Sequence, residues 1–166
     1  MGDVAMTVPV VAAVRRAYPK MRITVITRPF FRPFFADVEG VEFVDLDLKG
    51  RHKGVAGIRL LADELAERGV DAVADLHGVL RSHLLRSFMS LKGRKTARIR
   101  KGRIAKRQLI RQGYQNSEQL RTSIERYFEV MHRLGLTPDK IENWTPSLRQ
   151  VPQPIQPYAP KKGVWI

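Results

Sequence analysis

The sequence contains no cysteine among its 166 residues, and this absence excludes several classes of site at once. A disulfide scaffold, a cysteine–zinc centre and a catalytic thiol all need that residue, and a cysteine-free chain suits a reducing compartment. No apolar run approaches the roughly 20 residues that a membrane-spanning helix requires. With 43% hydrophobic and 28% charged residues, the chain is expected to fold around a core, as one domain or one half of something larger.

Several catalytic signatures are also missing. The sequence has no G-x-G-x-x-G or G-x-x-x-x-G-K-[ST] pattern, so it shows no glycine-rich loop that would cradle a phosphate. It has no G-x-S-x-G elbow and no H-E-x-x-H helix. His77 and His83 are six residues apart, which is poor spacing for two ligands on one helix face. We therefore expect no metal site.

Acidic residues are absent from one long stretch, between Asp75 and Glu118. Twelve of the 30 Lys and Arg residues lie between Arg81 and Arg111, so the net charge of +14 falls to +2 over the rest of the chain. Acidic partners four residues away would relieve the repulsion on a solvated helix, and here they are missing. This segment therefore favours an anionic partner. A smaller basic cluster comprises Lys49, Arg51, His52, Lys53 and Arg59.

Short β-rich runs alternate with helical ones along the chain. We expect helices over residues 7–17, 55–68, 79–91, 104–110 and 117–134, and strands over 22–27, 42–46, 70–76 and 96–99. Residues 30–35 are expected to form a short aromatic turn of helix that is broken by Pro33. Such alternation is typical of a parallel sheet with helices on its faces. The predicted fold class is therefore α/β, with a Rossmann-like parallel sheet and flanking helices.

The composition also suggests how the chain is divided. Five prolines occur between positions 146 and 160, so residues 138–160 are predicted to form an extended connector after a domain over residues 1–137. Residues 161–166 resemble the opening of a further strand. Because the chain enters a helix almost at once, we expect the first domain to lack its first, central strand. Both ends are therefore expected to be cuts through a larger protein.

Four acidic residues, at three places in the chain, are candidates for chemistry. Asp3 follows Gly2 and precedes a helix, so it is either a general base at the ligand edge of the sheet or a charge that stabilises the helix N-terminus. Asp45 and Asp47 have the D-x-D spacing of a metal pair, although an exposed strand end is the favoured interpretation. Asp75 ends a strand just before His77 and Gly78, where a structural role and a ligand-binding role are equally open.

In the order of the chain, residues 2–9, 15–19, 23–28, 71–82 and 121–136 together resemble glycosyltransferase family nine, the ADP-heptose:lipopolysaccharide heptosyltransferases and their relatives. The run from Gly2 to Pro9, followed by Arg15 to Pro19, resembles the family's first loop and helix. Ile23 to Arg28 resembles its second strand, and Asp71 to Ser82 resembles its D-x-x-x-D-x-(H/Q)-G-x-x-(R/K)-S segment. Arg121 to Leu136 resembles the helix that ends the N-terminal domain.

The resemblance implies a GT-B architecture, in which this chain is the acceptor-binding half and a second domain binds ADP-heptose. It implies an inverting transfer that needs neither metal nor cofactor, with Asp3 as the catalytic base. The acceptor would be inner-core lipopolysaccharide, Kdo-lipid A, at the cytoplasmic face of the inner membrane of a Gram-negative bacterium, and the anionic membrane surface would itself be a partner of this peripheral protein. The expected acceptor-binding residues are Gly2, Lys49, Arg51, Lys53, His77, Arg81, Arg98, Lys101 and Arg103.

Two other interpretations stay open. The cationic segment could belong to a nucleic-acid-binding module, although the near absence of aromatic residues within it disfavours stacking on single strands. The chain could also be a non-catalytic remnant that keeps the fold without activity. Even on the family interpretation, the chain alone is not expected to transfer sugar, since it holds no counterpart of a donor-binding domain.

Overall fold

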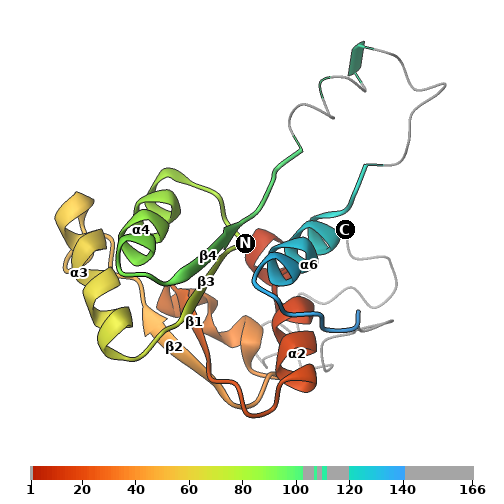
Figure 1. The fold of residues 1–166 in the computed structure, drawn as a ribbon, viewed down its shortest axis with the longest axis horizontal. Coiled ribbons are helices and arrows are strands. Elements are labelled where there is room, and N and C mark those ends of the chain that lie inside the picture. Colours follow the sequence, from red (N-terminus) through yellow and green to blue (C-terminus); the bar gives the residue numbers. More distant parts are fainter. Residues whose placement is uncertain (1, 103–106, 108–109, 112–119, 141–166) are drawn as a thin grey trace, which may run out of the picture.

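The computed structural model describes residues 2–102, 107, 110–111 and 120–140, which form parallel strands with helices on both faces (Figure 1). The predicted α/β class is confirmed. The elements in chain order are α1 (Gly2–Ala5), α2 (Val8–Ala17), β1 (Ile23–Thr27), the 3-10 helix η1 (Pro29–Phe35), β2 (Val41–Asp45), α3 (Gly54–Glu67), β3 (Ala72–Asp75), α4 (Leu80–Leu91), β4 (Lys95–Arg98) and α6 (Ser123–Arg133).

One helical layer consists of α3 and α4. Helical spacing places Ile58, Leu61 and Leu65 on the same side of α3, and all three are buried. They pack with Met89 of α4 and with β2 in one apolar cluster. Figure 1 shows these two helices together on one side of the strands.

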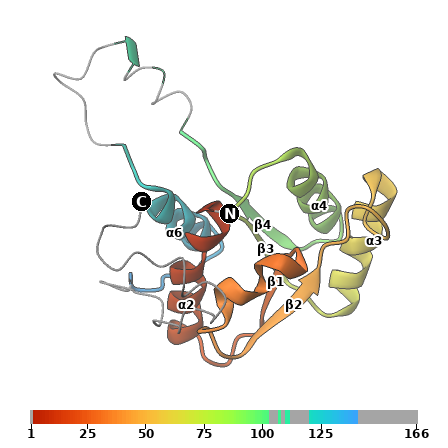
Figure 2. The same cartoon turned by 180° about the vertical axis from the view of Figure 1, so that it is seen from behind.

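The other helical layer consists of α2 and α6. Val10 and Val14 of α2 pack against Tyr127, Phe128 and Met131 of α6 in a second cluster, which also receives side chains from β1, from β3 and from the residue just after β4. Seen from behind, α2 and α6 again lie together and away from α3 and α4 (Figure 2). The strands are therefore covered on both faces, which explains why their sequences are rich in apolar residues.

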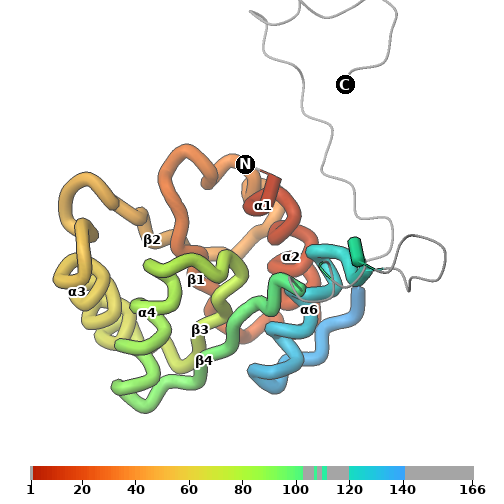
Figure 3. The backbone as a smooth tube through the Cα atoms, turned by 90° about the horizontal axis from the view of Figure 1, so that it is seen from above, coloured from red at the N-terminus to blue at the C-terminus, as the bar shows by residue number. Residues whose placement is uncertain are grey.

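The four strands of the described residues form two parallel pairs, β1 with β2 and β3 with β4. No ladder between β1 and β3 is found in this part of the chain. Nevertheless Ile26 of β1 and Val73 of β3 pack in the same cluster against α3 and α4. Ile23 and Ala74 share the opposite cluster. The two pairs are thus sandwiched between the same helical layers, as the view from above also shows (Figure 3).

Within the described residues, the expected elements agree with the structure apart from small shifts at their ends and three larger differences, at α1, η1 and the start of α6. The α6 helix begins at Ser123, because Thr122 and Glu125 form a capping box in which each side chain accepts the other residue's backbone N–H. The expectation that Pro33 breaks the aromatic turn is wrong, since η1 continues through it to Phe35. Pro33 lies four residues after Pro29, and a segment this short has few N–H groups to lose.

Some expectations fall outside the described residues. Most of the helix expected over residues 104–110, the connector expected over 138–160 beyond Lys140, and the strand expected over 161–166 belong to this group. The expected absence of a first, central strand stays a prediction. None of the helices in the described part of the chain is long and apolar enough to cross a bilayer.

Candidate functional site

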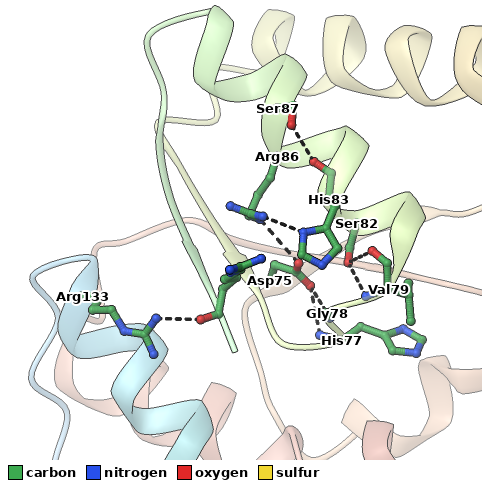
Figure 4. Close-up of polar contacts among 10 residues, drawn as sticks. Asp75, His77, Gly78, Val79, Ser82, His83, Arg86, Ser87 and Arg133 are labelled. Atoms are coloured by element: carbon green, nitrogen blue, oxygen red, sulfur yellow. Dashed lines mark hydrogen bonds and ion pairs between the residues drawn. The ribbon is translucent and has the colours of Figure 1, made fainter. Parts of the chain in front are cut away.

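The loop after β3 is built around the buried carboxylate of Asp75. Its Oδ1 accepts the backbone N–H groups of His77, at 3.1 Å, and Gly78, at 2.8 Å. Gly78 has φ +60°, a backbone conformation that glycine adopts without strain. The turn exposes the side chain of His77 and leads directly into α4 (Figure 4).

The second oxygen of Asp75 faces Arg86 on α4. Oδ2 is buried without a hydrogen bond and lies 3.5 Å from Arg86 Nε. Arg86 Nη2 lies 2.8 Å from Nδ1 of His83. Because a guanidinium only donates, His83 Nδ1 must accept, and the ring proton of neutral His83 is therefore on Nε2. Asp75, Arg86 and His83 thus form a polar chain behind the β3–α4 loop (Figure 4).

The backbone that leaves β4 is held by two arginines of α6. Arg133 Nη1 donates to the carbonyl of Arg98 at 2.8 Å, and Arg126 Nη1 donates to the carbonyl of Lys101 at 2.9 Å. Burial lowers the pKa of Arg133, and the charges of Arg100 and Arg98 lower it further. Cationic groups therefore converge here, and a bound anion would reduce the repulsion between them.

The β3 and β4 loops also meet each other. A Cβ added to Gly78 would lie 3.2 Å from Cε of Lys101. Asp75 and Arg98 are register partners at the ends of their two strands. The structure therefore brings His77, Arg98 and Lys101 to one edge, while Arg81 is exposed in the first turn of α4.

The loop after β2 carries a second basic group. Asp47 Oδ1 accepts the N–H groups of Lys49 and Gly50, and Oδ2 accepts that of Arg51. The bonds from Gly50 and Arg51 are the main reason that the pKa of Asp47 is lowered. Lys49, Arg51 and Lys53 are all exposed around this turn, and Arg51 pairs with Glu64 at 2.6 Å.

The Asp45–Asp47 pair is an exposed strand end, as favoured from the sequence. Asp45 forms an ion pair with Arg32 at 2.7 Å, and the Asp47 carboxylate is occupied by the loop amides. Within the described residues there is no group of three acidic or histidine side chains arranged to hold a metal ion.

Asp3 lies in the first turn of α1, which the sequence expectation had left as a loop before the helix. Its side chain is exposed, and its carbonyl accepts the hydroxyl of Tyr127 at 3.4 Å. Burial raises the pKa of Tyr127, and the Asp3 charge adds to this effect. Gly2 is exposed beside Asp3. The α1 helix also contacts η1, so Asp3 lies near the loop that follows β1.

The predicted site residues therefore fall into three groups: Gly2 and Asp3 on α1, Lys49 to Lys53 after β2, and His77 to Lys101 on the second strand pair. Arg103 lies outside the described residues. Sequence reasoning missed Arg126, Arg133 and Tyr127. The seven-residue spacing of Arg126 and Arg133, two helical turns, is the signal that would have placed both arginines on one face of α6.

No known protein-family profile matches the chain, and no curated protein matches it. Among solved structures, it is similar to a protein described as the glycosyl transferase family 9 from Veillonella parvula DSM 2008, with a TM-score of 0.57 and 23% identity. The match covers 82% of this chain and 39% of the other, so the chain spans well under half of that protein's length. The neighbour has a GT-B fold, and the likeness supports the parallel α/β fold described above.

Proposed function

We propose that this chain is the acceptor-binding part of a family-nine glycosyltransferase. The whole enzyme would move heptose from ADP-heptose to inner-core lipopolysaccharide, with inversion and without a metal ion or another cofactor. The observation that carries the proposal is the structural likeness to a family 9 glycosyl transferase over 82% of the chain. The ordered sequence resemblance from Gly2 to Leu136 supports it independently.

Asp3 is the proposed catalytic base. In this role its carboxylate accepts the proton of the acceptor hydroxyl as that oxygen attacks the anomeric carbon of the sugar. Its exposed position on α1, beside the loop after β1, leaves the carboxylate accessible to an acceptor. A positioned base typically contributes about 10²–10⁴-fold to the rate.

We assign acceptor binding to the cationic groups around β3 and β4. Inner-core lipopolysaccharide carries phosphates and carboxylates, and arginine can bind either of them through two parallel hydrogen bonds. Arg98 and Lys101 supply exposed side chains, and their backbone carbonyls are already bound by α6. The α6 helix therefore fixes the backbone while the side chains can bind an anion. On this proposal the protein works at the cytoplasmic face of the inner membrane.

The test is acceptor binding by charge-reversed variants. Two variants are compared with the wild type: a double variant with Arg98→Glu and Lys101→Glu, and a triple variant that adds Arg103→Glu. We expect each to weaken binding of detergent-dispersed Kdo-lipid A by about tenfold or more. The urea midpoint should hardly move, because the carbonyls that bind α6 are kept. The matched control is Lys20→Glu, at an exposed position just before β1. Unchanged acceptor affinity in the charge-reversed variants would contradict the proposal.

A second candidate function is supported by the acid-free segment from Arg81 to Arg111. A nucleic-acid-binding module would bind duplex or single strands with an affinity that falls steeply with salt. Titration of the chain with DNA and with Kdo-lipid A at two salt concentrations distinguishes the two functions. Selective binding of the glycolipid supports the transferase, and selective binding of DNA supports the module.

A further inference from the structure

The η1 segment presents a cluster of aromatic side chains to solvent. Phe30 is 69% exposed and Phe34 is 36% exposed. Both pack on Phe31, whose ring centroid lies 5.3 Å from that of Phe30 and 6.2 Å from that of Phe34. We call Phe30, Phe31 and Phe34 the aromatic tip. Contiguous exposed apolar surface of this kind is uncommon on soluble proteins and marks contact sites.

The segment that carries the aromatic tip is anchored to the domain core by Phe35. Phe35 is only 3% exposed and packs edge-on against Phe43 of β2, with 6.0 Å between the ring centroids. Pro29 and Pro33 each fix a backbone φ angle within η1. The segment therefore anchors one phenylalanine in the core and keeps the others outside it.

Basic residues lie at the same edge of the parallel β1–β2 pair as the aromatic tip. Arg28 links β1 to η1, and Lys49 and Lys53 lie in the loop after β2, the strand that pairs with β1. All three are exposed, and we call them the basic rim. Asp45, at the end of β2, pairs with Arg32, which is not part of the rim.

We infer that the aromatic tip and the basic rim dock this protein onto an anionic phospholipid bilayer. Aromatic rings partition to the headgroup level of membranes, and nearby lysine and arginine side chains are attracted to an anionic leaflet. The α1 helix, which carries Asp3, contacts η1, so docking would hold the proposed base close to the lipid surface. The inference rests on the proposed function in one respect, which is that the sugar acceptor is itself linked to a lipid.

The test uses the full 166-residue chain and vesicles that contain no glycan. We expect the chain to bind phosphatidylcholine vesicles that include phosphatidylglycerol, and to bind pure phosphatidylcholine vesicles much more weakly. Phe30→Glu with Phe34→Glu should reduce binding to the anionic vesicles by about tenfold or more. Lys49→Glu with Lys53→Glu should reduce it as well, with a loss that shrinks as salt is raised. Phe30→Trp should retain binding.

Two control variants match these changes in chemistry but not in position. Leu91→Glu alters an aliphatic side chain that is 84% exposed at the far end of α4, and Lys20→Glu alters an exposed lysine just before β1. Neither should change vesicle binding. Equal vesicle binding by the tip variant and the Leu91 variant would overturn the inference. It would indicate that the aromatic tip contacts another protein domain and not a bilayer. Binding of detergent-dispersed Kdo-lipid A, measured separately, tests the proposed function without the bilayer.

Discussion

The loops after β2 and β3 use the same turn chemistry in opposite environments. In each loop an aspartate accepts backbone N–H groups from the residues that follow it. Asp47 is exposed, and both of its oxygens are satisfied by the loop itself. Asp75 is 5% exposed, and one of its oxygens depends on Arg86, eleven residues away on another element. The Asp47 carboxylate is therefore satisfied within its own loop, whereas the Asp75 carboxylate needs the packed domain around it.

This difference suits the two proposed roles. The β2 loop is anchored by the buried His52, whose Nδ1 accepts the backbone N–H of Asp47 at 3.1 Å, while Lys49 and Lys53 stay exposed and free to meet a fluid bilayer. The β3 loop is tied to α4 through Arg86 and approaches Lys101 at Gly78, so its residues keep fixed positions. Fixed positions suit recognition of a particular acceptor.

The largest effect should come from removing the partner of the buried carboxylate. Arg86→Met leaves Asp75 buried and uncompensated, so we expect a loss of about 3–5 kcal/mol in the free energy of unfolding. Arg32→Met is the matched control, because Arg32 pairs with Asp45 at the end of β2 and the two side chains are 44% and 45% exposed, as in a surface ion pair. Such pairs contribute about 0–1 kcal/mol. Urea unfolding of both variants measures the difference, and equal losses would show that the two ion pairs do not differ as described.

An intermediate effect should come from the glycines with positive φ. Gly78 (φ +60°) belongs to the β3 loop, and Gly54 (φ +68°) begins α3 after the β2 loop. Alanine at either site adopts a left-handed conformation that costs about 1–2 kcal/mol. At Gly78 the new Cβ would also lie 3.0 Å from Cγ2 of Ile99, whereas nothing lies within 4 Å at Gly54. We therefore expect Gly78→Ala to lower the thermal midpoint more than Gly54→Ala; the reverse order would contradict the crowding argument.

The smallest effect should be a pH dependence at the exposed aspartate. The N–H groups of the β2 loop hold the pKa of folded Asp47 below its ordinary value of 3.8. Its contribution to stability is thus fully present above that value, and it is lost as pH falls through the lower folded pKa. Asp47→Asn removes this component. We expect the urea midpoint of the variant to fall less than that of the wild type between about pH 5 and about pH 2. Parallel curves for the two proteins would show that the loop does not favour the charged carboxylate.

Local patterns were sufficient to predict most of the elements. Helical spacing of apolar residues predicted α3 and α4, and β-branched runs predicted β1 and β2, because those signals are carried by neighbours in sequence. The start of α6 was misplaced, although the Thr122–Glu125 pair is a recognisable capping signal. The continuation of η1 through Pro33 depends on Phe35 being anchored against Phe43, a contact that only the folded chain makes.

The candidate site was less predictable for the same physical reason. Whether Asp75 is structural or ligand-binding could not be decided from the sequence, because its partner Arg86 comes from the far side of a turn and faces it only after folding. The hydroxyl of Tyr127 meets the carbonyl of Asp3 across 124 positions of sequence. Contacts of that range leave no periodic trace in the chain. Charge composition, in contrast, needed no geometry to predict that the region around Arg98 is cationic.

The division of the strands into two pairs has a consequence for the behaviour of this polypeptide at high concentration. In the described residues the inner edges of β1 and β3 are not joined to each other by backbone hydrogen bonds. Unpaired strand edges are templates that extended segments of other molecules can join, through main-chain bonds that are indifferent to side-chain charge. Because these edges lie between the two helical layers, a segment of another molecule can reach them only where the layers open locally, and self-association would then grow with protein concentration and persist in salt that screens the strong positive charge. Rapid amide hydrogen exchange along the inner edges of β1 and β3 would mark where such assembly begins.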